Sequence, residues 1–215
     1  MGRTAMNAAG KPARKPSGNR MARTRERKQE ILDAALECFS SIGYDQTTIE
    51  DIRAKAGASI GSIYHHFGAK DRIAAALYLR GVRETQDAGL EALLAADSAE
   101  SGIAAQVAAY IDWVVANPAF ARFLFASRHA AFLHEADAVI NELNRGIHEQ
   151  AGDWIRARIA SGDLPDVEPA MRWAIVFGPC RHWAGAWLRG TTSTSPDDAK
   201  RRIATAAYAG LQSLR

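Results

Sequence analysis

The chain has 215 residues, of which 47% are hydrophobic and 24% are charged, a balance typical of a soluble globular protein with room for a small and a larger domain. No run of eighteen or more apolar residues occurs, and the basic start lacks an apolar core, so we expect neither a membrane-spanning helix nor a secretory signal. The two cysteines, Cys38 and Cys180, fall inside helical patterns and indicate buried thiols of a cytoplasmic protein.

The formal net charge of +3 is unevenly distributed. Residues 1–30 carry nine basic and two acidic side chains, a charge of +7, which leaves −4 for the rest of the chain. A basic end on a mildly acidic body indicates an arm that binds a polyanion, although a solvated tail that only aids solubility has the same composition. Residues 1–22 have almost no large apolar side chains, so we predict a disordered arm.

The remaining sequence predicts helices almost throughout, without strand alternation. The first helix is expected over residues 24–41, and Gly43 is the expected stop after its C-terminus. The spacing of three and four residues predicts that one face of it is buried, consisting of Ile31, Ala34, Ala35, Cys38 and Phe39.

Two short helices follow, over residues 48–56 and 59–67. Thr48 and Asp51 have the spacing of a capping box at the start of the first, with Thr47 and Glu50 as the adjacent register, and Ser59 is placed to cap the second. A fourth helix is predicted from Lys70 to about residue 95, and then a loop over residues 97–102. Further helices are expected at about 103–117, 118–133, 137–161, 169–189 and 196–214.

The two short helices form a helix-turn-helix pattern, with Ala56, Gly57 and Ala58 in the turn. In the second helix, Ile60, Ile63 and Phe67 share one face and are expected to pack on the preceding helices. The outer face has small or hydrogen-bonding side chains and no acid: Ser59, Gly61, Ser62, Tyr64, His65 and His66. Such a helix fits the major groove of DNA. The alternative from spacing alone is an ordinary all-α core in which Tyr64 only packs.

The N-terminal sequence resembles the signature of the TetR family of repressors. The resemblance covers about residues 27–77 and rests on Ile31-Leu32-x-x-Ala35-x-x-x-Phe39, Gly43-Tyr44-x-x-Thr47-Thr48-Ile49, Asp51-Ile52 and Ala56-Gly57-x-Ser59-x-Gly61-Ser62-Ile63-Tyr64-x-His66-Phe67-x-x-Lys70. It implies an all-α protein of about nine helices, with a DNA-binding domain at 23–70 and a regulatory and dimerisation domain at 71–215. Arg53 and Ala58 depart from the usual pattern, and Arg53 would add a phosphate contact.

The resemblance also implies roles in DNA binding. Thr48 would contact a phosphate, and Ser59, Gly61 and Ser62 would lie against the major groove. Tyr64 and His65 would contact the backbone or bases, while His66 and Lys70 would contact further phosphates, Lys70 from a helix N-terminus.

The C-terminal part is rich in aromatic residues, most of which a helical core of this size requires. The resemblance implies a mostly apolar pocket there, for which we predict a lining of Trp113, Phe123, His129, Trp173 and Phe177. Apolar walls favour a hydrophobic or aromatic small-molecule effector.

The last two helices are predicted to form a homodimer. Small residues interrupt the bulky helix at Ala174, Gly178, Gly185 and Ala186, and such positions let another helix approach closely. The resemblance places a four-helix dimer interface here, although tight packing within one chain would also explain the pattern. A two-fold dimer would read two half-sites of a palindromic operator on double-stranded DNA.

No catalytic, metal or cofactor motif is evident. Cys180 and His182 are two residues apart and would point to different faces of a helix. We therefore predict a non-enzymatic repressor that a small molecule releases from its operator. The alternatives are a constitutive DNA-binding protein, and a helical small-molecule binding protein or enzyme in which the N-terminal helices are only structural.

Overall fold

The computed structural model describes residues 18–127, 130–134 and 136–215, and within these ranges every regular element is helical. There are nine α-helices and one short 3₁₀ helix in the described ranges, so the prediction of an all-α fold of about nine helices is confirmed. No helix in these ranges is long and apolar enough to cross a membrane.

The N-terminal unit consists of α1 (Gly18–Ile42), α2 (Ile49–Ala56) and α3 (Ile60–His66), packed around the first turns of α4 (Lys70–Leu94). The predicted stripe of α1 is buried, and Ile52, Ile63 and Leu77 complete this core. α1 begins at Gly18, six residues before the predicted start, so residues 18–22 of the predicted arm are helical. Residues 1–17 of that arm lie outside the described residues.

The helix ends in this unit follow the sequence signals. Thr48 and Asp51 form a reciprocal capping box at the start of α2, as predicted. Ser59 caps α3 by accepting a hydrogen bond from the Ser62 backbone N–H at 3.1 Å. Gly57, at the end of α2, has a φ of +56°, a left-handed conformation that glycine adopts without a steric cost. These ends fix the angle at which α3 leaves α2.

The C-terminal body contains α5 (Ala99–Ala116), α6 (Pro118–Ser127), the 3₁₀ helix η1 (Ala131–Leu133), α7 (Asp137–Ala160), α8 (Pro169–Leu188) and α9 (Pro196–Gln212). α5 begins inside the predicted loop, because Ser98 and Ser101 form a capping box that the prediction missed. The single helix predicted over residues 118–133 is instead divided into α6 and η1, whose buried Phe132 packs against Tyr44 of the N-terminal unit.

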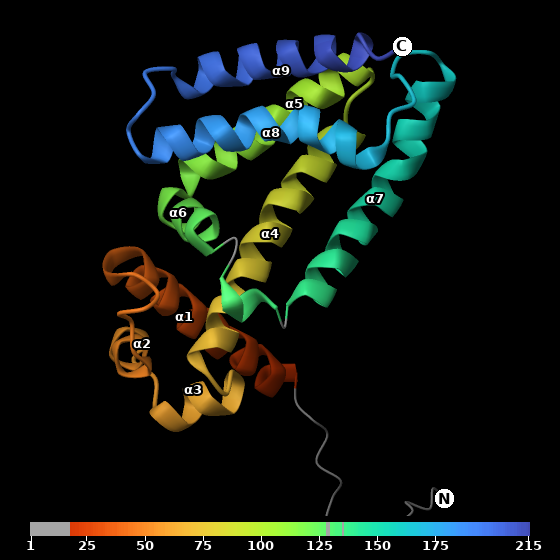
Figure 1. The fold of residues 1–215 in the computed structure, drawn as a ribbon. Coiled ribbons are helices and arrows are strands. Elements are labelled where there is room, and N and C mark those ends of the chain that lie inside the picture. Colours follow the sequence, from red (N-terminus) through yellow and green to blue (C-terminus); the bar gives the residue numbers. More distant parts are fainter. Residues whose placement is uncertain (1–17, 128–129, 135) are drawn as a thin grey trace, which may run out of the picture.

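Figure 1 shows how α4 joins the two parts: it rises from α1–α3 into the body, where α5, α8 and α9 lie across its far end. α8 and α9 run antiparallel to each other over α5, and α7 lies to one side, packed on α4. A second core, centred on Val107, Ile111 and Cys180, holds α5, α8 and α9 together. One continuous helix therefore borders both parts of the molecule.

Candidate nucleic-acid interface and internal cavity

Helix α3 is attached by one side and free on the other. Ile63 is fully buried against α1 and α2, and Phe67 packs on the same core. Ile60 was expected on that face, but 46% of it is exposed. The expectation was wrong because Ile60 lies in the first turn of α3, beyond the edge of the contact with the core.

The free side of α3 has few bulky groups. A Cβ added at Gly61 would meet no atom within 4 Å, Tyr64 is 51% exposed, and His65 is also exposed. Ser62 and His66 are half-buried at the edges of this surface. The face is thus accessible, uncharged at its centre and supplied with hydroxyl and imidazole groups that donate and accept hydrogen bonds.

Positive charge gathers at the C-terminal end of α3. Burial lowers the pKa of His66, and the nearby His65, Lys28 and Arg27 lower it further. The two arginine or lysine residues in this set belong to α1, so the basic start of α1 lies close to the end of α3. Such a site favours an anion, because a bound phosphate would relieve the repulsion among these groups.

Thr48 and Lys70 are engaged within the protein. The Thr48 hydroxyl donates to Asp51 Oδ2 at 2.7 Å. Lys70 Nζ donates to the backbone carbonyl oxygens of Tyr44 and Thr47, each at 2.9 Å, and lies 4.5 Å from the centroid of the Tyr44 ring. Lys70 therefore fastens the loop between α1 and α2 to the start of α4, and its ammonium group points into that loop.

The C-terminal body contains a partly open cavity of about 720 Å³ between α4, α5, α6, α7 and α8. Trp113, Trp173 and Phe177, three of the five residues predicted from sequence, line it. Phe123 does not; its ring stacks on Phe39 of α1 with centroids 5.6 Å apart, in the core between the two parts of the molecule. His129 lies outside the described residues.

Polar groups of the cavity that the sequence analysis missed come from four helices, among them Gln106 of α5. Gln86 Nε2 of α4 donates to Asn144 Oδ1 of α7 at 2.6 Å, and Arg172 and Arg181 of α8 also contribute to the lining. The sequence did contain a sign of Arg172. It is a charged residue four positions before Val176, and the apolar pattern predicts that this side of α8 faces inward.

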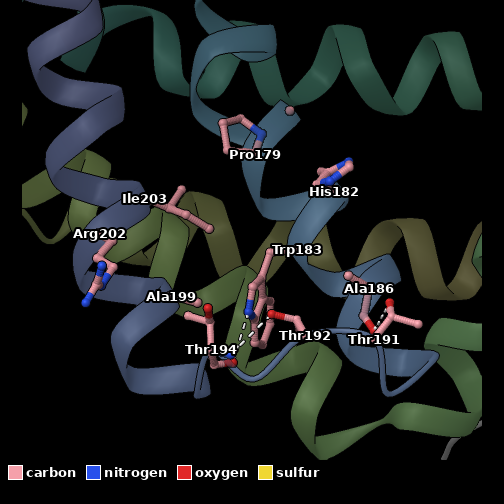
Figure 2. A pocket seen from close by; sticks show the side chains of 11 residues that line it. Pro179, His182, Trp183, Ala186, Thr191, Thr192, Thr194, Ala199, Arg202 and Ile203 are labelled. Carbon is pink, nitrogen blue, oxygen red and sulfur yellow. Dashed lines mark hydrogen bonds between the residues drawn. The ribbon is translucent and has the colours of Figure 1, made fainter.

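A second hollow, of about 600 Å³, lies on the outer side of α8 and α9. Figure 2 shows Pro179 and His182 on one helix, Arg202 and Ile203 on the other, and the loop of Thr191–Thr194 closing one end. Trp183 Nε1 fixes this loop by donating to the Thr194 carbonyl oxygen at 3.3 Å.

The small residues predicted as a dimer stripe divide between two sides of α8. Gly178 and Ala186 line the outer hollow, and Ala174 is exposed. Gly185 is buried instead: a Cβ there would lie 3.5 Å from the Phe125 ring of α6. Close packing within the chain therefore accounts for one of these positions and leaves the others on the surface.

Direct contacts connect the cavity wall to the N-terminal unit. Arg80 of α4 forms an ion pair with Asp33 of α1 at 2.7 Å, and its guanidinium lies 4.8 Å from the centroid of the Phe120 ring in α6. The Phe120 ring in turn packs against Trp113, which lines the cavity. A chain of three side chains thus runs from the cavity to α1.

Comparisons with known proteins agree with this architecture. The profile of the family described as "Bacterial regulatory proteins, tetR family" matches residues 31–77. The HTH-type transcriptional repressor KstR2 of Rhodococcus jostii is 30% identical over 207 residues, which cover 87% of this chain and 92% of that protein. The HTH-type transcriptional repressor AcnR of Corynebacterium jeikeium is 46% identical over 48 residues, 22% of this chain and 25% of the relative.

Several AcnR-type relatives are matched over only about a quarter of their own length. Among solved structures, the transcriptional regulator FadR of Bacillus subtilis in complex with stearoyl-CoA superimposes with a TM-score of 0.72. The alignment has 19% identity and covers 85% of this chain and 98% of that one. At this identity the likeness concerns the fold.

Proposed function

This chain belongs to the TetR family of bacterial regulatory proteins, and we propose that it is a transcriptional repressor that a small molecule releases from its DNA operator. The observation that carries the proposal is the course of α4. The helix begins four residues after the end of α3 and lines the internal cavity along its last two thirds, from Tyr78 to Leu93. A ligand in the cavity would therefore contact the same helix that supports the helix-turn-helix.

The proposed DNA interface is the free face of α3 with the basic start of α1. Ser59, Gly61 and Ser62 would allow close approach to the major groove, and Tyr64 and His65 would contact bases or backbone. Thr48 and His66 would face phosphates. Because the Lys70 ammonium is held by loop carbonyls, its part would be to position the loop and add charge near a phosphate at the α4 N-terminus.

The proposed dimer uses the outer faces of α8 and α9. The surface there combines the small residues Ala174, Gly178 and Ala186 with the hollow beside Ile203, so that a second copy could pack closely. A two-fold dimer would place two α3 helices toward successive major grooves of a palindromic operator.

Release would follow from a change in the separation of the two α3 helices. A ligand shifts this equilibrium only if it binds the DNA-competent and the released state with different affinities. The contacts of Arg80 with Asp33 and Phe120 support a coupled movement of α4, α6 and α1.

Selection of bound duplexes from a random-sequence pool tests the proposal and would supply the operator. Tyr64→Ala is expected to weaken binding to the selected duplex by about five- to a hundred-fold, the usual range for a lost base-directed contact. The control is Val139→Ala on α7, where the replaced side chain is 44% exposed. Equal affinity of both variants and the parent, with an unchanged salt dependence, would contradict the proposal.

A further inference from the structure

The internal cavity is long and narrow. Its lining extends from Tyr78 to Leu93 on α4 and from Ile140 to Ile155 on α7, and fifteen residues of helix correspond to about 22 Å. A volume of about 720 Å³ over such a length describes a channel. The shape suits an extended ligand better than a compact ring system.

Apolar side chains dominate the channel around Leu90, Leu93, Ala151 and Trp154, where the walls form a small hydrophobic cluster of their own. The charged side chains of the lining are on or next to α8, and α7 adds the exposed imidazole of His148. They are Arg172 and Arg181, with the exposed Glu168 as the acid of the lining. The channel thus has an apolar cluster formed by α4 and α7 and, on or next to α8, two arginines against one acid.

Arg172 has unused hydrogen-bonding capacity. Its Nη2 donates to the Val167 carbonyl oxygen at 2.6 Å, but its Nε is buried and has no hydrogen-bond partner among the described residues. Burial lowers the pKa of Arg172, an effect that the neighbouring exposed Asp166 opposes. A buried donor without a partner is costly, and a guanidinium offers a fork that matches the two oxygens of an anionic group.

Arg181 adds a second cation near the outside. Its guanidinium lies over the Trp173 ring, 5.6 Å from the centroid, and 43% of Trp173 is exposed. The ring of Trp173 also packs against Phe177 inside the channel. Since Trp173 is both part of the lining and exposed to solvent, this pair would attract an anion from solution and shield the apolar part of the ligand from water.

We propose that the effector is an amphipathic anion: an extended apolar body that fills the channel, with a carboxylate or phosphate group bound by the Arg172 guanidinium. This inference rests on the proposed effector function of the cavity and adds a charge to the hydrophobic effector expected from the sequence. Arg181 would guide the ligand at the opening, and Arg172 would hold its head group.

The test compares hexadecanoate, hexadecyl phosphate and the uncharged hexadecan-1-ol, each titrated below the concentration at which it aggregates or separates from solution. Quenching of tryptophan fluorescence reports binding, since Trp113, Trp154 and Trp173 line the channel. At least one of the anions is expected to bind about ten-fold or more tightly than the alcohol. The anion that does so identifies the head group.

Arg172→Gln is expected to weaken binding of that anion by about ten- to a hundred-fold and to leave the alcohol unchanged, which would show that the channel is intact. Arg172→Lys should retain part of the preference for the anion over the alcohol, because lysine keeps the positive charge but cannot donate two parallel hydrogen bonds to the head group. Arg156→Gln is the matched control, since the Arg156 side chain is 71% exposed on α7 and does not line the channel.

Equal affinity for anions and alcohol, a preference that survives in Arg172→Gln, or no binding of any probe would overturn the inference. DNA release is measured separately, by displacement of a labelled operator duplex. An anion that binds through Arg172 without releasing DNA would leave this inference standing and refute the proposed switch. If only an uncharged molecule released DNA, the proposed switch would stand and this inference would be refuted.

Discussion

The N-terminal unit and the C-terminal body are built for opposite kinds of contact. The N-terminal unit has a buried core around Ile31, Ile52 and Leu77. Its candidate interface lies on the outside, where no atom lies within 4 Å of a Cβ added at Gly61. The second keeps a channel of about 720 Å³ in its interior. A surface that meets a rigid partner needs particular side chains at fixed positions, whereas a channel needs mainly volume and apolar walls.

The same difference should appear in stability. A tightly packed core cannot adapt to a lost side chain without leaving a void, while a wall that already borders empty space loses fewer contacts when it is shortened. The contrast between the two parts therefore leads to predictions about folding as well as about binding.

Shortening the N-terminal core should have the largest effect. Leu77→Ala removes a fully buried side chain, and we expect the free energy of unfolding to fall by about 2–5 kcal/mol. Ile147→Ala, in the channel wall, should cost less, about 1–2 kcal/mol, because the replaced side chain is only partly buried. Urea titrations followed by circular dichroism give both values. Equal losses would mean that the channel wall is as tightly packed as the core.

Placing a negative charge on the free face of α3 should have the next largest effect. A Cβ at position 61 meets no atom within 4 Å, and Gly61→Glu replaces a residue that disfavours helix, so the fold should be retained. Repulsion from DNA phosphates should weaken operator binding by about a hundred-fold or more. Fluorescence anisotropy on the selected duplex measures this loss.

The matched control is Gly146→Glu, which has the same charge change and the same open surroundings on α7. Its operator affinity should stay within about two-fold of the parent once salt is fixed. If Gly61→Glu bound as tightly as this control, α3 would not be the recognition element.

The contrast between surface and channel also explains what the sequence could predict. Thr48, Ser59 and Gly57 act through local backbone geometry, which depends on neighbours three or four residues away, so their roles were readable from spacing. Ile63 was readable for a similar reason, since a buried helix face has a fixed period.

Ile60 and Phe123 depended on contacts between distant segments, and their placement could not be derived from period alone. Ile60 lies on the apolar side of α3 but beyond the reach of α1 and α2, so it stays exposed. Phe123 packs on Phe39, eighty-four positions earlier in the chain, instead of lining the channel. Aromatic side chains satisfy a core and a pocket equally well, and only the assembled helices decide between them.

Arg80 tests whether the two parts communicate. Arg80 contacts Asp33 in the N-terminal unit and Phe120 in the body. Arg80→Gln should therefore weaken these contacts between the two parts without creating a cavity in either core. We expect the ligand-induced change in operator affinity to shrink by about 0.5–2 kcal/mol, or roughly two- to thirty-fold. The measurement is the operator dissociation constant with and without a saturating effector, for which we would use the anion that binds most tightly in the titrations proposed above.

Arg83→Gln is the control on the same helix, because Arg83 is exposed and the same charge is lost. Coupling that stayed constant in Arg80→Gln would show that the body and the N-terminal unit move together through other contacts, of which α4 itself is the first candidate.

The smallest effects concern the two cysteines, which report on local opening in the two parts. Cys38 lies in the N-terminal core with 8% exposure, and Cys180 lies in the body with none. Burial raises the pKa of both thiols, that of Cys180 to about 12, and the Cys180 thiol donates to the Val176 carbonyl oxygen. Since the thiolate is the reactive form, at pH 8 only about one Cys180 in ten thousand would be ionised in the folded state.

Labelling with a disulfide reagent, on Cys38→Ser and Cys180→Ser variants that each keep one thiol, should therefore be slow, and slower for Cys180 than for Cys38. If reaction proceeds within the folded state, the Cys180 rate should rise about ten-fold for each pH unit, because its pKa lies far above the working range. A rate independent of pH would mean that opening of the helices limits the reaction. Suppose that ligand in the channel slows labelling of Cys180 and leaves Cys38 unchanged. The ligand would then suppress local opening of the C-terminal body alone. Equal slowing of both cysteines would show that the recognition helix and the channel belong to one cooperative unit.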